Sequence, residues 1–160
     1  MISAGLSSGG LLELERKTAM AHAPDAAAAA GFGVHLTLDG YGGSRHRLAD
    51  ADHIRARLSE LPELLGMHKL IEPMVVEVNQ LSDKDPGGLS GYVLIAESHI
   101  SIHTFPLRGF VSADVYTCQN SLDADRIRQY FADAFALEDI ETNLIRRGTR
   151  YPQYNIYEAP

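Results

Sequence analysis

Side chains able to carry out acid–base or nucleophilic chemistry gather in one segment of the chain, which reads ESHISIHT and begins at Glu97. Ser98 offers a hydroxyl nucleophile, and His99 and His103 follow it with imidazoles. The single cysteine of the chain, Cys118, comes shortly after this segment. A nucleophile beside groups that exchange protons is a common composition of catalytic sites, so this segment is the candidate for chemistry.

Three kinds of chemistry compete for these side chains. A hydrolase would use Ser98 as nucleophile, His103 as base and Asp114 to orient the base, but no G-x-S-x-G turn surrounds the serine. A metal site at His99 and His103 is disfavoured, because four residues of strand separate the two by about 13 Å, too far to share an ion.

The third chemistry is an internal acyl rearrangement at the serine. The Ser98 hydroxyl would attack the preceding carbonyl carbon and form an ester, and elimination and hydrolysis would then leave a pyruvoyl group at a new N-terminus. This reaction needs a serine on a strained turn and a nearby proton-transfer group, for which His103 is suited. The residue types alone do not choose among the three chemistries, because Ser and His near a strand end most often have no chemical role.

Hydrophobic periodicity divides the chain into the strands and helices that would position this segment. Asp50 suits the start of a helix that Pro62 should kink or end, and Ser121 suits the start of a second helix. Residues 91–98 are nearly all apolar, as expected of a strand covered on both faces. The predicted strands cover residues 32–43 (with a glycine turn), 74–78, 91–98, 99–105, 111–118 and 141–148, and the predicted helices cover 50–66 and 123–138.

The order of these elements, β-α-β-β-β-α-β, predicts an α+β fold, a two-layer α/β sandwich with an antiparallel sheet and helices on one face. The other face would be exposed unless a second subunit covers it, so we expect a homodimer. A single domain is expected over residues 32–160, since the chain is short for two domains. Residues 1–31 carry few large apolar residues, and we expect a disordered extension there or a true start at Met20.

Charge and cysteine content narrow the partners and the location. A net charge of -7 disfavours nucleic-acid binding, which needs clustered Lys and Arg. No apolar run approaches the roughly 20 residues that span a bilayer, and no signal peptide pattern opens the chain, so we expect no membrane partner. A single cysteine excludes a disulfide within the chain and favours a reducing, cytoplasmic setting.

A resemblance to a known family favours the third chemistry. The run ESHISIHTFP, followed by ADVYTC, resembles the bacterial S-adenosylmethionine decarboxylase proenzyme family, and the similarity extends from about Gly33 through residue 148. The resemblance implies an S-adenosylmethionine decarboxylase-like fold and self-cleavage between Glu97 and Ser98. It also implies that Ser98 becomes a covalent pyruvoyl group, the cofactor that forms a Schiff base with the amine of a small-molecule substrate.

The same resemblance implies roles for three further residues. His103 would assist processing, Cys118 would donate a proton to the decarboxylated carbon, and Ser90 would help to hold the site. The pyruvoyl group would accept the electrons released as carbon dioxide leaves, the role that pyridoxal phosphate plays elsewhere. The implied protein is a lyase of polyamine biosynthesis that is made as a zymogen.

Two positions depart from the family pattern, and both fall on the part of the pocket that holds the nucleoside. Leu107 stands where the family has a glutamate that contacts the ribose, and Lys84 stands where it commonly has an aromatic residue that stacks on adenine. With Phe105, these residues make up the predicted substrate pocket. Because leucine cannot accept a hydrogen bond from a hydroxyl, we expect a basic amino acid as substrate, L-ornithine or L-arginine.

Two alternatives stay open beside this prediction. The first is S-adenosylmethionine itself, held by other residues such as Phe105, Phe110 or Tyr92 and decarboxylated for spermidine synthesis. The second is a non-catalytic protein that activates a paralogue, which the intact serine, histidine and cysteine disfavour.

Overall fold

The computed structural model of the chain describes residues 31–152 and 154–158. Residues from Gly31 onward form one compact unit. The extension predicted over residues 1–31, with its alternative start at Met20, lies outside the described residues apart from Gly31.

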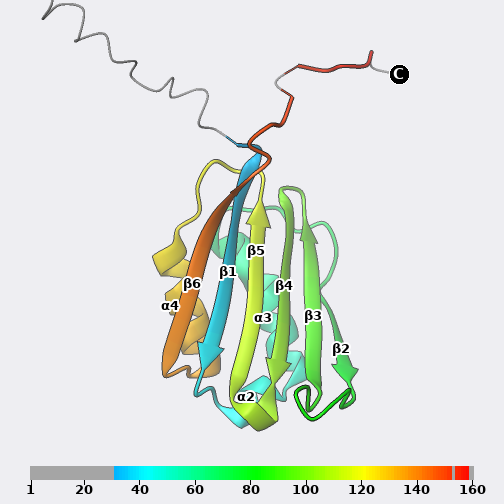
Figure 1. Cartoon of the computed structure of the whole chain (residues 1–160). Coiled ribbons are helices and arrows are strands. Elements are labelled where there is room, and N and C mark those ends of the chain that lie inside the picture. Colours follow the sequence, from blue (N-terminus) through cyan, green and yellow to red (C-terminus); the bar gives the residue numbers. More distant parts are fainter. Residues whose placement is uncertain (1–30, 153, 159–160) are drawn as a thin grey trace, which may run out of the picture. The chain divides into compact units, whose positions relative to one another are not determined.

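Six antiparallel strands form a single sheet in the described part of the chain, and Figure 1 shows that sheet face-on. The strands are β1 (Gly33–Tyr41), β2 (Met74–Val78), β3 (Gly88–Ile95), β4 (Ser98–Phe105), β5 (Phe110–Thr117) and β6 (Asp139–Arg147). Their order across the sheet is β2-β3-β4-β5-β1-β6, so the hairpins β2–β3, β3–β4 and β4–β5 lie side by side. The segment predicted to carry chemistry therefore occupies a central strand, β4, and the turn before it.

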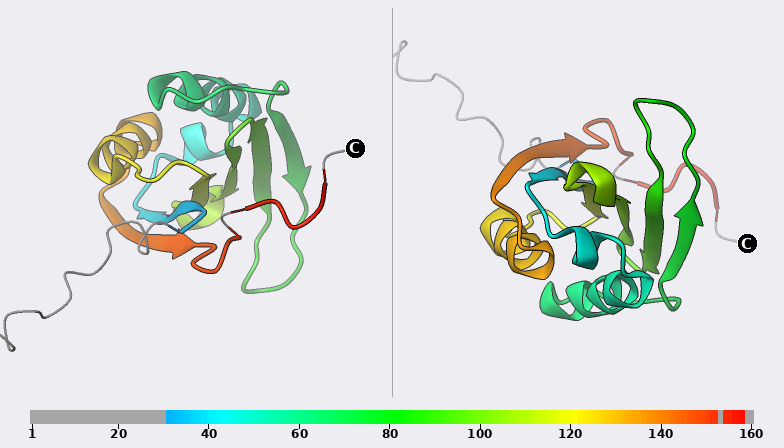
Figure 2. Two further views of the ribbon diagram at one scale, coloured as in Figure 1. Left: turned by 90° about the horizontal axis from the view of Figure 1, so that it is seen from above. Right: turned by 90° about the horizontal axis from the view of Figure 1, so that it is seen from below.

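The helices lie on one face of this sheet, as the views along the strands show (Figure 2). The two long helices are α3 (Ala51–Leu64) and α4 (Ala124–Phe135). A short helix that was not predicted, α2 (Arg45–Leu48), precedes α3, and a 3-10 turn, η1 (Pro106–Arg108), joins β4 to β5. Alternate strand residues meet the apolar faces of the helices in one core. Its largest fully buried side chains are Phe131, Phe135, Leu36, Leu38, Leu48, Ile54, Leu58, Leu61, Ile95, Ile100, Ile102 and Ile127.

This architecture confirms the predicted two-layer α+β sandwich with an antiparallel sheet and helices on one face. The carboxylate of Asp50 caps α3 and accepts two backbone N–H groups at 3.0 Å each. Pro62 lies in the last turn, and the helix ends at Leu64. The predicted cap of the second helix is wrong, because α4 begins at Ala124 and the carboxylate that caps it belongs to Asp123 rather than to Ser121.

No helix covers the opposite face of the sheet in the described residues, and we call this surface the open face. The prediction that residues 91–98 are covered on both faces is wrong for a single chain. Tyr92 and Leu94 point away from the helices and are 40% and 42% exposed, while Val93 and Ile95 are buried. Other exposed apolar residues on the open face are Met74, Val76 and Ile145.

Candidate functional site

The predicted cleavage site lies in the tight turn between β3 and β4. Ile95 pairs with Ser98 across the hairpin, so Ala96 and Glu97 form the whole loop. The backbone of Ser98 has a φ of 154°, a conformation that a residue with a Cβ adopts at a cost of about 1–3 kcal/mol. Because φ is defined through the carbonyl carbon of Glu97, breaking the Glu97–Ser98 bond would release this strain. The strained turn that the rearrangement requires is therefore present.

The register between β4 and β5 places Cys118 beside the same peptide bond. Ser98 pairs with Thr117, the last residue of β5, and Cys118 follows directly. The backbone N–H of Cys118 donates a hydrogen bond of 2.9 Å to the carbonyl oxygen of Glu97. A donor at this oxygen stabilises the negative charge that would develop there if a nucleophile attacked the carbonyl carbon. The thiol itself is free, and Cys118 is exposed.

His68 holds the turn from its other side. Its backbone N–H and its ring Nδ1 lie 3.1 Å and 2.8 Å from the two carboxylate oxygens of Glu97. Its carbonyl oxygen accepts the N–H of Ala96 at 2.8 Å. The hydrogen bond from the His68 side chain is the main reason why the pKa of the Glu97 carboxyl is lowered from its usual value. His68 was not among the predicted site residues, because its contact with Glu97 joins residues 29 positions apart and leaves no local pattern in the sequence.

The imidazole within hydrogen-bonding distance of the Ser98 hydroxyl belongs to His99. Its Nδ1 lies 3.2 Å from Oγ of Ser98. The ring of Tyr116, which faces His99 across β4 and β5, packs at 5.7 Å and 71° to the imidazole. His103, the proton-transfer group predicted from the sequence, lies five residues along the same strand, about 16 Å from Ser98 at the usual rise per residue.

His103 and Ser90 do meet, at the other end of β4. The two residues face each other across β3 and β4, and Oγ of Ser90 lies 2.8 Å from Nδ1 of His103. The structure thus brings the predicted site residues together in two groups. Ser98 and Cys118 lie at one end of the strand, and Ser90 and His103 lie at the other.

A hollow of about 540 Å³ lies near the Ser90–His103 end. It includes two of the three residues predicted for the substrate pocket, but Leu107 is 63% exposed on η1 and is not among its lining residues. The rings of the two phenylalanines in the wall lie 5.7 Å apart. The lining residues are Lys84, Asp85, Phe105, Arg108 and Phe110.

Asp114, considered above as the orienting group of a hydrolase, belongs to a separate hydrogen-bonded chain on the open face. Its carboxylate accepts from Nε2 of His35 at 2.9 Å and from the Ser101 hydroxyl at 3.3 Å. Arg147 donates to Nδ1 of His35 at 3.0 Å, which leaves the ring proton of His35 on Nε2. Since Ser98 also lies far from His103, the structure assembles no hydrolase triad.

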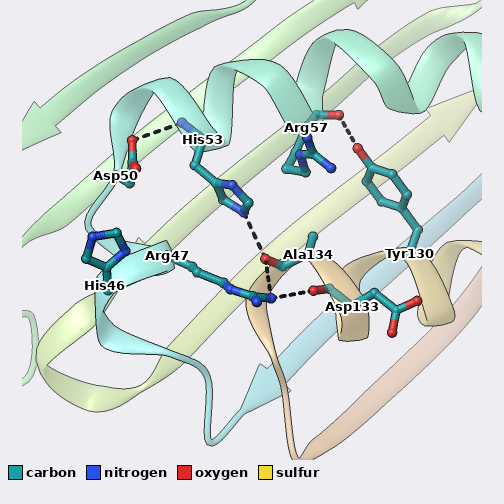
Figure 3. Close-up of a pocket in the computed structure, with 8 residues that line it drawn as sticks. All are labelled: His46, Arg47, Asp50, His53, Arg57, Tyr130, Asp133 and Ala134. Carbon is teal, nitrogen blue, oxygen red and sulfur yellow. Dashed lines mark hydrogen bonds between the residues drawn. The ribbon is translucent and has the colours of Figure 1, made fainter.

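A second hollow, of about 510 Å³, lies on the helix side of the molecule among α2, α3 and α4 (Figure 3). Arg47 and His53 both donate to the carbonyl of Ala134, at 3.4 Å and 2.8 Å, and so hold the C-terminal end of α4. The Tyr130 hydroxyl donates to the carbonyl of Arg57 at 2.8 Å, and burial raises the pKa of Tyr130. None of the predicted site residues lines this hollow, whose side chains mainly tie the helices together.

In the described part of the chain, no helix has the length and apolar character needed to cross a membrane. Among the same residues, no three His, Cys, Asp or Glu side chains are grouped closely enough to hold a metal ion.

Comparisons with known proteins show the family to which the chain belongs. The family model described as S-adenosylmethionine decarboxylase matches residues 34–148. The S-adenosylmethionine decarboxylase proenzymes of Thermococcus onnurineus and Brevibacillus brevis are each 33% identical over 117 residues, which is 73% of this chain and 78% and 83% of theirs. The crystal structure of the adenosylmethionine decarboxylase from Aquifex aeolicus matches with a TM-score of 0.65 and 29% identity, over 79% of this chain and 99% of that one.

The chain is a carboxy-lyase, and its class is that of the pyruvoyl-dependent decarboxylases that are made as proenzymes. It belongs to the S-adenosylmethionine decarboxylase family, and the matched region contains the strained turn and every residue predicted for the site. The resemblance carried by ESHISIHTFP, the predicted class of enzyme and the predicted fold are thereby confirmed.

Proposed function

We propose that this chain cleaves itself between Glu97 and Ser98 and then decarboxylates S-adenosylmethionine with the pyruvoyl group formed from Ser98. The observation that carries the proposal is the geometry of the turn. Ser98 has a strained φ of 154°, and the carbonyl before it accepts the N–H of Cys118 at 2.9 Å. An attack by the Ser98 hydroxyl would therefore lead to relief of the backbone strain. It would also place negative charge on the Glu97 carbonyl oxygen, which already accepts a hydrogen bond from the Cys118 N–H.

Cleavage consumes no other reactant than water. Oγ of Ser98 adds to the carbonyl carbon of Glu97, and loss of the amide nitrogen from that carbon gives an ester. Removal of the Cα proton of Ser98 then expels the Glu97 carboxylate and leaves dehydroalanine. Water releases ammonia from the tautomer of that residue, which yields a pyruvoyl group on the new chain.

The residues of the turn are suited to hold that group and to serve its reaction. Bound to the chain, the pyruvoyl group supplies a ketone that withdraws the electron pair released as carbon dioxide leaves. Cys118, held against the turn by its backbone, carries the thiol that returns a proton to the substrate carbon. The hydrogen bonds from His68 hold the Glu97 carboxylate beside the turn before cleavage.

The division of the site supports a homodimer in which each chain completes the site of the other. Ser98 lies about 16 Å from His103 within one chain, so His103 and Ser90 can reach the pyruvoyl end only from a second copy. A copy turned end for end over the open face would bring the two groups together. The exposed Tyr92 and Leu94 on that face would be buried in the same contact.

The substrate proposal follows the relatives, which are named S-adenosylmethionine decarboxylase proenzymes. The hollow near His103 supports it through its walls. Phe105 and Phe110 offer apolar walls to a neutral nucleoside. The comparisons likewise favour S-adenosylmethionine over the basic amino acids predicted from the sequence.

The missing ribose contact has a candidate replacement in the same hollow. Leu107 cannot accept a hydrogen bond, but Asp85 is half-buried and presents a carboxylate to the cavity. One of its oxygens accepts the N–H of Gly87 at 3.0 Å, which fixes the orientation of the carboxyl group. The second oxygen would accept a ribose hydroxyl. The cytoplasmic location predicted from the single cysteine stays a prediction.

Release of labelled carbon dioxide tests the proposal. The purified wild-type chain and the Ser98→Ala variant are each given carboxyl-labelled S-adenosylmethionine, L-ornithine or L-arginine. We expect release from S-adenosylmethionine by the wild type and none by the variant. Turnover of an amino acid alone would overturn the substrate, and no turnover by an uncleaved wild type would favour the regulatory protein.

Complementation tests the shared site. Ser98→Ala and His103→Ala chains, each with its own tag, are produced separately and together. A mixed dimer retains one intact pair of groups, so activity should return only on co-expression. If the mixture stays as inactive as the separate variants, the two groups do not act across a dimer.

A further inference from the structure

His99 has no role in the chemistry described so far, although its ring is the one that touches the reacting hydroxyl. Nδ1 of His99 lies 3.2 Å from Oγ of Ser98. We propose that His99 is the base that takes the proton from Ser98 in the first step of self-cleavage. This assignment rests on the proposed function, because it concerns the reaction that makes the pyruvoyl group.

The other groups that could accept this proton are occupied or distant. The Glu97 carboxylate is the nearest anion in sequence, but His68 binds both of its oxygens. His103 lies about 16 Å away in the same chain, and its Nδ1 is engaged with Ser90. Self-cleavage through His99 needs no group from a second copy, so ester formation can begin within one chain.

Neighbouring rings fix the direction in which His99 points. Tyr116 packs edge-on against the imidazole at 5.7 Å, and it also contacts His35 at 5.4 Å. The guanidinium of Arg147 covers the Tyr116 ring at 4.7 Å from its centroid. An imidazole held in this way keeps Nδ1 toward Ser98, and it serves as an acceptor when the ring carries its proton on Nε2.

The proposed step balances within the turn. The proton of the Ser98 hydroxyl moves to Nδ1 of His99 while Oγ bonds to the carbonyl carbon of Glu97. The electron pair of the C=O bond moves to oxygen, where the Cys118 N–H donates to it. When the carbonyl forms again, the bond from carbon to the Ser98 nitrogen breaks, and the imidazolium gives its proton to that nitrogen. The result is an ester and a neutral imidazole.

Hydroxylamine provides a direct assay of this step, because it splits an ester but leaves a peptide bond intact. Wild-type, His99→Ala and His103→Ala chains are made by cell-free synthesis, and samples are taken over time with and without hydroxylamine. General-base catalysis contributes about 10²–10⁴-fold, so we expect ester formation in the His99→Ala chain to slow by at least about 100-fold. The His103→Ala chain, which has the same substitution on the same strand face, should still be split by hydroxylamine.

A rescue variant distinguishes a lost base from a damaged fold. Replacing Ser98 with cysteine supplies a thiol that ionises near pH 8.5 without a base. At pH 9 we expect hydroxylamine to split the Ser98→Cys, His99→Ala double variant about as fast as the Ser98→Cys variant. If the double variant stays intact, His99 has a structural role and the proposal is wrong.

The outcomes separate this inference from the proposed function. A wild-type chain that never splits would overturn self-cleavage itself. A wild-type chain that splits, together with a His99→Ala chain that forms ester at the same rate, would overturn only the role of His99.

Discussion

Replacing Ser98 by alanine or by glycine separates the nucleophile from the backbone strain. Both variants lack the hydroxyl, so each should remain one uncleaved chain. Alanine keeps the Cβ that makes a φ of 154° unfavourable, whereas glycine adopts this conformation readily. The difference in stability between the two variants therefore reports the strain at the cleavage site.

Three effects set the difference in the free energy of unfolding between the two variants; the first favours glycine and the other two favour alanine. Strain at such a position costs about 1–3 kcal/mol, and glycine relieves it. The glycine variant is less stable by about 0.5–1 kcal/mol, because glycine has greater conformational freedom in the unfolded chain. Glycine also lacks the methyl group of alanine. At the half-buried position of Ser98 this absence lowers the free energy of unfolding by about 0.4 kcal/mol, half of the value for full burial. The glycine variant should therefore be more stable by about 1 kcal/mol.

Urea unfolding at one fixed protein concentration measures this difference. With a slope of about 2 kcal/mol per molar, the glycine variant should unfold at a midpoint about 0.5 M higher than the alanine variant. Ser112 provides a matched control, because it is also half-buried in a strand but has an ordinary φ. At this position the alanine variant should be more stable than the glycine variant by about 0.9–1.4 kcal/mol, the sum of the same two effects without the strain. If alanine is favoured over glycine by as much at position 98 as at position 112, the turn is not strained and self-cleavage would relieve no strain.

Three further predictions concern the turn and the pocket. The Cys118→Ala variant should still split, but it should release at least about tenfold less correctly protonated product by mass spectrometry of the reaction mixture; turnover equal to the wild type would remove the thiol from the reaction. The Asp85→Ala variant should lower kcat/KM for S-adenosylmethionine by about 5- to 100-fold, corresponding to a lost hydrogen bond of about 1–3 kcal/mol, whereas Leu107→Glu, at a residue outside the hollow, should leave it unchanged; an unchanged value in Asp85→Ala would show that this carboxylate does not bind the ribose. Because the pKa of Glu97 is lowered in the folded chain, its contact with His68 stabilises the fold above the usual carboxyl pKa and is lost as the pH falls through the lowered value. The stability gap between Ser98→Ala chains with Glu97 and with Glu97→Gln should therefore close in acid, and a gap that is constant from pH 7 to pH 3 would contradict this assignment.

Local patterns were sufficient to predict most of the fold. The spacing of Ile54 and Leu58 along α3 and the alternation along β5 each reflect one buried face, which is visible within a few residues. The helix cap at Asp123 was missed in favour of Ser121, because two carboxylates and a hydroxyl lie within five residues and the sequence does not show which one meets the first turn. The exposure of Tyr92 and Leu94 on β3 was not predicted. An apolar run in the sequence does not show whether its second face is covered by a helix of the same chain or by a second chain.

The site was harder to predict, because its contacts depend on strand register. Nothing in the sequence near Ser98 shows that Cys118 donates to the preceding carbonyl, or that His68 binds Glu97. The division of the site, by contrast, could have been predicted. A separation of five strand residues already places His103 about 16 Å from Ser98, the same argument that excluded a shared metal ion.

A denaturing mass spectrum of the purified protein, taken after cyanoborohydride treatment with S-adenosylmethionine, ornithine and arginine, shows both whether the chain is cleaved and which amine it binds. We expect two chains, divided between Glu97 and Ser98. The C-terminal chain should be lighter by one ammonia than a chain beginning with serine, or heavier by the S-adenosylmethionine amine trapped on it. A single full-length chain, or a C-terminal chain that still begins with serine, would show that Ser98 does not become a pyruvoyl group.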